Sequence, residues 1–328
     1  MPSARSPGAR SGGTLWGPTI SGEQMAAPRA FGRNRGLQTR MVITVLLLGL
    51  IYVVLIAVLI AAGVGAIAVA VIGCVLFLVQ YFSSGQLALA SMGADPVTPS
   101  QAPELHAIVE RLCVQANIPM PTVAIADTPM PNAFAIGRSP STSTVCVTTG
   151  LLNLVSGPEL EGVLGHELTH IVNRDVMLMT IASFFASIAS FIVQIGFWFG
   201  GGFGGGSDND DDGPGFFAVV LVAGLVYIVS FVLIQALSRY REFAADRGSA
   251  LITGRPSALS SALLKISGVL DQLPQRDLRL ASGELKAFYI VAPDIRQSVG
   301  SLFSTHPPLE ARLKALAKLE SQLQGQAA

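Results

Sequence analysis

Four long apolar blocks divide this chain into membrane-like and more polar parts. The blocks contain no charged side chain and cover residues 42–62, 66–82, 176–200 and 216–237. Because a helix of ~20 apolar residues can cross the hydrocarbon core of a bilayer, the pattern predicts four transmembrane helices in two hairpins, at 41–83 and 176–238. A buried hairpin in a soluble core is the alternative for the second pair, but uncharged runs of this length favour the membrane.

The segments between and after the predicted hairpins have the pattern of a globular domain. The short runs "PTVAIAD" and "STVCVTTG" alternate or run apolar as strands do. Apolar residues recur at helical spacing in 103–116, 151–173, 257–270 and 308–323. We therefore predict a mainly α membrane protein with one α+β domain, which contains a small β-sheet and is built in two parts, residues 84–175 and 239–328.

The composition agrees with a membrane protein. Of the 328 residues, 51% are hydrophobic and 13% are charged, a balance too apolar for an ordinary soluble domain of this length. Lys plus Arg and Asp plus Glu each number 21, and the sequence has no basic stripe interleaved with aromatic residues. The expected partners are therefore a lipid bilayer and proteins, and nucleic acid is not among them.

Charges outside the apolar blocks predict the orientation of the chain in the membrane. Residues 1–40 contain six arginines and one glutamate among many Gly, Ser and Pro residues, which is typical of a disordered basic tail. The Gly- and Asp-rich loop at 200–215 has no Lys or Arg, whereas Arg239, Arg241 and Arg247 follow the last block. By the positive-inside rule, the tail and the globular domain are cytoplasmic and the loop is external. We expect a multi-pass protein of the plasma (inner) membrane; a cleaved signal peptide fits less well, because no convincing A-x-A site follows the first block.

The sequence "HELTH", residues 166–170, is the strongest candidate for a site of chemistry. On an α-helix, residues i and i+4 lie ~40° apart around the axis and ~6 Å apart along it, so His166 and His170 can direct both imidazoles at one metal ion. Glu167 lies beside that face, where a carboxylate can act as the base of a zinc protease. The alternative is a pair of ordinary histidines, but an apolar helix would then bury two polar rings without partners.

A catalytic zinc site needs a third protein ligand. The metzincin pattern would place glycine and histidine where this chain has Asn173 and Val176. The best candidate is Glu242 in "RYREFAADRGSA", because two spans between it and HELTH would return the chain to the same side of the membrane. Asp246 lies one turn further on the same helical face and is well placed to accept a hydrogen bond from a ligand imidazole.

His306, in "STHPPLEARL", is a candidate donor to the oxyanion of a tetrahedral intermediate. The alternative is that His306 has no catalytic role and only precedes a helix whose first turn contains Pro307 and Pro308. No other histidine is as good a candidate, because His106 lies on an amphipathic helix and is expected at the surface.

The segment "TPMPNAFAIGRSP" predicts a strand with a free edge. An extended substrate could pair with that edge through main-chain hydrogen bonds. The residues of this candidate substrate-binding edge are Asn132, Ala133, Phe134 and Ala135. The alternative is a plain strand entry, because Pro129 and Pro131 cannot donate to a sheet.

The set "PNAFAIG", "HELTH", "REFAAD" and "STHPPLEARL" resembles the HtpX-like branch of the M48 family of membrane metallopeptidases, over roughly residues 40–320. The resemblance implies a gluzincin-type protease domain with one Zn²⁺ per subunit. It also implies that His166, His170 and Glu242 bind the zinc and that Glu167 is the catalytic base. The implied role is endopeptidase cleavage of damaged, misfolded or misassembled membrane proteins in quality control and stress response.

Other functions explain the sequence less well. The related CAAX prenyl proteases have more spans than the four predicted here. A zinc-dependent scaffold without catalysis would be favoured by loss of the glutamate after the first histidine, but Glu167 is present. A transporter would need ionisable residues inside its spans, and all four apolar blocks lack them.

Overall fold

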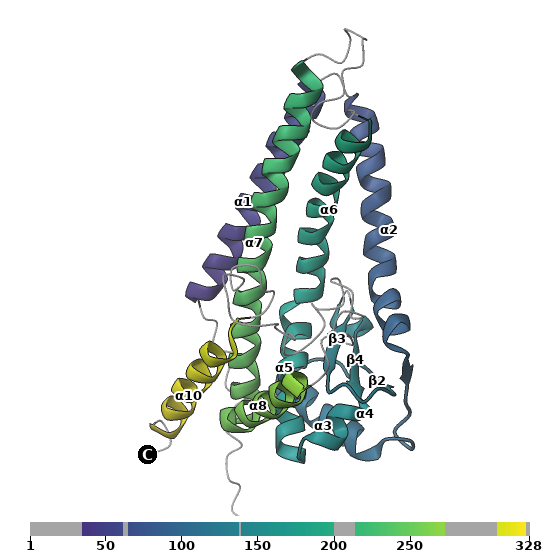
Figure 1. The fold of residues 1–328 in the computed structure, drawn as a ribbon. Coiled ribbons are helices and arrows are strands. Elements are labelled where there is room, and N and C mark those ends of the chain that lie inside the picture. Colours follow the sequence, from purple (N-terminus) through teal and green to yellow (C-terminus); the bar gives the residue numbers. More distant parts are fainter. Residues whose placement is uncertain (1–34, 62–64, 138, 200–213, 273–306, 326–328) are drawn as a thin grey trace, which may run out of the picture. The chain divides into compact units, whose positions relative to one another are not determined.

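The computed structural model describes residues 35–61, 65–137, 139–199, 214–272 and 307–325. Its longest elements are four helices that carry the apolar blocks (Figure 1): α1 (Arg35–Ala61), α2 (Ala66–Met92), α6 (Asp175–Phe199) and α7 (Pro214–Thr253). The end of the predicted tail, from Arg35 on, is already helical. The rest of the tail, most of the predicted external loop and His306 lie outside the described residues.

Three helices in the described part of the chain are long and apolar enough to cross a membrane. They are Thr39–Ala61, Met177–Gln194 and Ala218–Thr253. The apolar part of α2, Ala70–Phe82, is shorter than the ~20 residues that a bilayer core requires. The prediction of several apolar membrane helices is confirmed, whereas the fourth span is not.

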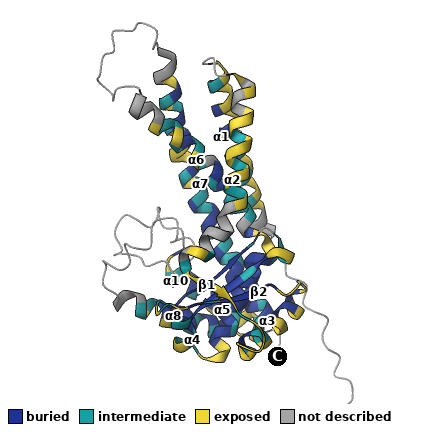
Figure 2. Ribbon diagram, turned by 90° about the vertical axis from the view of Figure 1, so that its right-hand side faces the viewer, coloured by how far each residue is buried: buried dark blue, intermediate teal, exposed yellow. Residues whose placement is uncertain are grey.

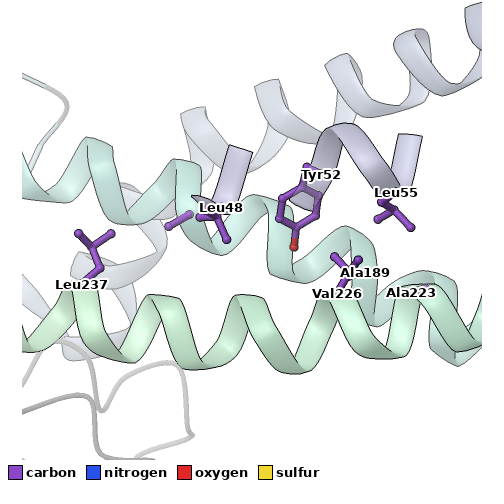
Figure 3. Close-up of a cluster of buried hydrophobic side chains, with 8 residues drawn as sticks. Leu48, Tyr52, Leu55, Ala189, Ala223, Val226 and Leu237 are labelled. Atoms are coloured by element: carbon purple, nitrogen blue, oxygen red, sulfur yellow. The ribbon is translucent and has the colours of Figure 1, made fainter. Parts of the chain in front are cut away.

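The long helices pack through one apolar seam and expose their other faces. Helix α7 packs against both α1 and α6, and α2 packs against α6. Figure 3 shows the buried apolar cluster at the seam. Tyr52 of α1, a member of the cluster, also shares a hydrogen bond of 2.9 Å with the Ser230 hydroxyl of α7. Away from the seam, Leu46, Leu50 and Val53 of α1 are 61–67% exposed, and Figure 2 shows exposed residues along the long helices. Such apolar faces suit a lipid environment better than water.

A four-stranded mixed sheet forms the β part of the protein. Its order is β1 (Ala94–Pro96), β2 (Thr122–Ala126), β4 (Thr144–Thr148), β3 (Ala133–Ile136). Strands β2 and β4 are parallel, and the other two pairs are antiparallel. One face of the sheet packs against the end of α2. The predicted small sheet is therefore confirmed, and β3 lies at its edge.

Helix α5 (Gly157–Asn173) is the central element of the globular part. It contacts α3 (Pro103–Ala116), β3, α7 and α8 (Pro256–Gln272), while α10 (Leu309–Gly325) contacts α7 and α8. Short elements, η1 (Pro140–Thr142) and α4 (Thr149–Leu154), flank β4.

The first turn of α5 is fixed by Glu159. The Glu159 carboxylate accepts hydrogen bonds from the Ser156 amide at 2.7 Å, from Ser261 at 2.5 Å and from Lys265 at 2.7 Å. Burial by itself raises the pKa of Glu159, but the hydrogen bonds from Lys265, Ser261 and Ser156 outweigh it and lower the pKa to about 2. The charged carboxylate thus completes a capping box and joins the start of α5 to α8.

Helices α5 and α7 approach each other through small residues. A Cβ on Gly248 would lie 2.3 Å from Thr169 Cγ2, so only glycine fits there. One residue on, Ser249 donates a hydrogen bond to the Gly162 carbonyl at 2.7 Å. This close approach holds the HELTH face of α5 against the C-terminal half of α7.

Candidate metal centre

Helix α5 presents two imidazoles to one point. His166 and His170 are both buried, and their Nε2 atoms lie 3.2 Å apart. Their rings meet edge to face with centroids 4.8 Å apart. The spacing of four residues places both side chains on the same face of the helix, as the sequence predicts.

Helix α7 adds a carboxylate to the same point. Glu242 Oε2 lies 3.5 Å from His166 Nε2, and Glu242 Oε1 lies 3.6 Å from His170 Nε2. All three candidate ligand atoms lie within 4.8 Å of one another. Ligand atoms ~2.1 Å from a tetrahedral zinc ion would be roughly 3.4 Å apart. The separations and the donor types therefore fit a divalent cation such as zinc.

The far side of each imidazole faces a second carboxylate. His166 Nδ1 lies 3.0 Å from Asp246 Oδ1, and His170 Nδ1 lies 2.7 Å from Asp175 Oδ2. A carboxylate that accepts a hydrogen bond from Nδ1–H keeps the proton on Nδ1 and leaves Nε2 with its lone pair. The two Nε2 lone pairs and the Glu242 carboxylate then point to one place. A bound cation would stabilise this arrangement.

The carboxylates around His166 favour positive charge. Burial alone would lower the pKa of this imidazole, but its contacts with Asp246 and Glu242 outweigh burial and raise the pKa to about 9. A group of acidic side chains that attracts a proton in a buried position also attracts a metal cation.

Arg312 of α10 is a part of this cluster that the sequence did not predict. Its Nη2 donates to Asp246 Oδ1 at 2.6 Å and its Nε donates to Asp246 Oδ2 at 2.9 Å. The guanidinium also lies 3.7 Å from Glu242 Oε2. This bidentate ion pair orients the Asp246 carboxylate, which in turn faces His166.

Glu167 lies beside the candidate ligands and contacts the edge strand. Its Oε2 accepts a hydrogen bond from the Ala135 amide of β3 at 3.0 Å. Burial raises the pKa of Glu167, while the nearby imidazoles of His166 and His170 act to lower it. A buried carboxylate with a raised pKa is a suitable proton acceptor for catalysis.

The structure brings the predicted edge residues close to HELTH. Strand β3 pairs with β4 on one side only, its four residues are buried, and it contacts α5. Asn132, just before β3, is held by Thr148: the Asn132 amide donates to Thr148 Oγ1, and the Asn132 carbonyl accepts from the Thr148 amide. The backbone amide of Ala135 donates its hydrogen bond to Glu167.

Two residues of the centre were missed for different reasons. Asp175 follows His170 by only five residues. An acidic residue directly after the motif helix is the pattern that could have identified it. Arg312 lies within "STHPPLEARL". This motif supported the family resemblance, but no role was assigned to its arginine. A basic residue in an amphipathic helix gives no local sign that it is buried.

Comparisons with known proteins give a consistent result. The family model "Peptidase family M48" matches residues 99–320. The chain is 51% identical over 296 residues to a "Protease HtpX homolog" of Moorella thermoacetica, covering 90% of this chain and 98% of that protein. It is 47% identical over 295 residues to "Protease HtpX homolog 2" of Methanosarcina acetivorans, covering 90% and 99%.

A solved structure titled "Crystal Structure of S. mikatae Ste24p" is a more remote match. The identity is 19%, the TM-score is 0.49, and the match covers 86% of this chain and 67% of that one. A TM-score of this size does not establish a common fold.

Proposed function

The chain belongs to peptidase family M48 and is a membrane-bound metalloprotease, and on that premise we propose that it is a zinc endopeptidase. Its substrates are damaged, misfolded or misassembled proteins, including membrane proteins, and its role is quality control under stress. The observation that carries this proposal is the convergence of His166, His170 and Glu242 next to the buried carboxylate of Glu167.

One zinc ion per chain would be held by the two Nε2 atoms and the Glu242 carboxylate. When bound, the ion supplies Lewis-acid polarisation of the scissile carbonyl and makes water a better nucleophile. Asp246 keeps the His166 imidazole in the tautomer that exposes Nε2. The C-terminal helix contributes through Arg312, which holds Asp246 in place.

Glu167 is the general base. Its carboxylate accepts a proton from the attacking water and then transfers it to the leaving amine. The Ala135 amide fixes one carboxylate oxygen, so the other oxygen is the one directed at the reaction. Burial, which raises the pKa of Glu167, strengthens it as a base.

The edge of β3 is the proposed substrate-binding strand. Along an antiparallel edge, alternate residues direct their amides and carbonyls away from the neighbouring strand. Ala135 is such a residue, because its amide reaches Glu167, and Ala133 is the next one in the alternation. An extended peptide that pairs with Ala133 would lie beside HELTH, and His306 is the proposed donor to the oxyanion.

In the membrane, we propose four spans with the metal site and the N-terminus in the cytoplasm of the plasma membrane. The domain is built in two parts, 84–175 and 239–328, around the hairpin 176–238. In support, α7 is one continuous helix that carries the apolar block and, further along, Glu242. Helix α2 carries the second predicted block, and none of its 27 residues is charged.

Cleavage of casein and of an unfolded membrane protein in detergent tests the proposed activity. We expect activity that a chelator abolishes and zinc restores. Glu167→Gln should keep the metal and lose ~10²–10⁴-fold in rate, because an amide cannot accept the proton of water. His166→Ala should lose metal and activity together. Retained proteolysis in metal-loaded Glu167→Gln protein would refute the proposed mechanism.

Thiol labelling in intact cells tests the orientation. In a background without Cys74, which is exposed, we expect an impermeant reagent to label Asp210→Cys from outside and to leave Asp95→Cys unlabelled. The reverse result would place the site on the external side.

A further inference from the structure

Asp175 is a buried acidic residue whose side chain serves the metal centre. It is the first residue of α6 and is 0% exposed. Its Oδ2 lies 2.7 Å from His170 Nδ1 and 3.5 Å from Arg241 Nε of α7. Within the described residues its Oδ1 receives no hydrogen bond. The carboxylate is thus removed from water, and its charged neighbours are the His170 imidazole and the Arg241 guanidinium.

The contact between Asp175 and His170 depends on a break in the helix. In a continuous α-helix, a residue five positions after His170 would lie ~140° around the axis from it. Instead, Arg174 ends α5 in the left-handed conformation, with φ of 57°. This conformation is uncommon for a residue other than glycine. The break lets α6 begin with Asp175 facing the imidazole.

An ordinary capping role does not account for this arrangement. Acidic residues are common at helix N-termini because they interact with free backbone amides and the helix dipole, but such residues usually remain in contact with water. Burying a carboxylate is costly unless hydrogen bonds and opposite charge compensate. Here the compensation comes from a candidate metal ligand and from Arg241, the neighbour of Glu242.

We propose that Asp175 is the positioning residue for His170 and that, with Arg241, it joins the metal centre to the membrane helices α6 and α7. The inference rests on the proposed metal-binding function. Each ligand histidine then has its own carboxylate with an arginine beside it: Asp246, which Arg312 hydrogen-bonds, faces His166, whereas Asp175, at ion-pair distance from Arg241, faces His170. The second pair comes from the residues where the membrane helix α6 begins and the apolar block of α7 ends.

The test separates helix capping from metal positioning. Asp175→Ser retains a capping hydroxyl but is too short to reach the imidazole, while Asp175→Asn retains an oxygen that can accept a hydrogen bond from Nδ1–H. Metal affinity is measured by chelator competition with Zn²⁺ on the purified full chain, and ligand geometry by the absorption spectrum with Co²⁺. Asp95→Ser, at an exposed position in β1, is the matched control.

We expect Asp175→Ser to bind Zn²⁺ ~10–100-fold more weakly than wild type, the usual effect of losing a residue that orients a ligand. Its Co²⁺ spectrum should change, and Asp175→Asn should recover part of the affinity. The metal-free Asp175→Ser protein should melt below wild type, because Arg241 loses its charged partner, so Zn²⁺ affinity is compared at a temperature where both proteins are folded. Wild-type Zn²⁺ affinity and an unchanged Co²⁺ spectrum in Asp175→Ser would overturn the inference and leave Asp175 as a helix cap.

Two further variants keep the test decisive. If Asp175→Ser does not fold, Asp175→Asn and Arg241→Met replace it. Both should weaken Zn²⁺ binding measurably. Unchanged affinity in both would refute the positioning of His170 by Asp175 and Arg241. Failure of the proposed function looks different: wild type would then bind no Zn²⁺, or His170→Ala would bind it as well as wild type.

Discussion

Removal of the Arg312 guanidinium should destabilise the protein more than any single exposed charge does. Arg312 and Asp246 have side chains only 2% and 1% exposed, and two charge-assisted hydrogen bonds of 2.6 and 2.9 Å join them. In Arg312→Met, the methionine fills much of the space but leaves the Asp246 charge buried. Loss of one partner from a buried pair costs roughly 3–5 kcal/mol.

Thermal unfolding in detergent, followed by circular dichroism in the presence of a chelator, measures this cost without the contribution of bound metal. A loss of this size corresponds to a melting temperature lower by on the order of 6–20 °C. Arg111→Met is the control, because Arg111 is 52% exposed and its ion pair with Glu161 is 3.3 Å long. Pairs of that kind contribute ~0–1 kcal/mol.

A double variant separates the two roles of the ion pair. Adding Asp246→Leu to Arg312→Met removes the uncompensated charge, so much of the stability should return. Zn²⁺ affinity should stay ~10–100-fold below wild type, because His166 has lost its acceptor. The reasoning is wrong if Arg312→Met is no less stable than Arg111→Met.

Two other predictions concern the framework of the site. Gly248→Ala should destabilise the protein by ~1–3 kcal/mol through overpacking against Thr169. Gly268→Ala, where a Cβ meets no atom within 4 Å, should stabilise it by up to ~1 kcal/mol. Equal melting temperatures of the two variants would contradict the close packing of Gly248 against Thr169. Because the pKa of Glu159 is about 2 in the folded protein against 4.5 for a free carboxyl, the unfolded chain binds more protons between these values. Stability should therefore fall as pH falls from 4.5 toward 2, and less steeply in Glu159→Gln; parallel pH profiles of the two proteins would refute the assignment.

Local periodicity accounts for the parts of the site that could be predicted from sequence. HELTH and REFAAD each fit within two helical turns, so the faces of His166, His170 and Glu242 follow from residue spacing alone. The apolar blocks likewise predicted long helices, because the bilayer sets a minimum length. The meeting of the two motifs followed from the predicted hairpin between them, which would return the chain to the same side of the membrane.

Tertiary packing determines the parts that could not be predicted. Arg312 follows Asp246 by 66 residues, and nothing in the pattern of α10 indicates that its arginine is buried. Asp175 reaches His170 only because Arg174 adopts a conformation that its residue type disfavours. The apolar block 216–237 predicted a long helix but not that the same helix continues to Thr253.

X-ray absorption spectroscopy at the zinc edge, on purified wild-type protein and on Glu242→Ala, tests whether His166, His170 and Glu242 bind zinc. The account predicts one zinc per chain, with nitrogen and oxygen neighbours at ~2.0–2.2 Å and no sulfur neighbour. Glu242→Ala should lose most of the metal, because two histidines alone form an incomplete site. Full zinc occupancy with an unchanged spectrum in Glu242→Ala would contradict the site formed by His166, His170 and Glu242.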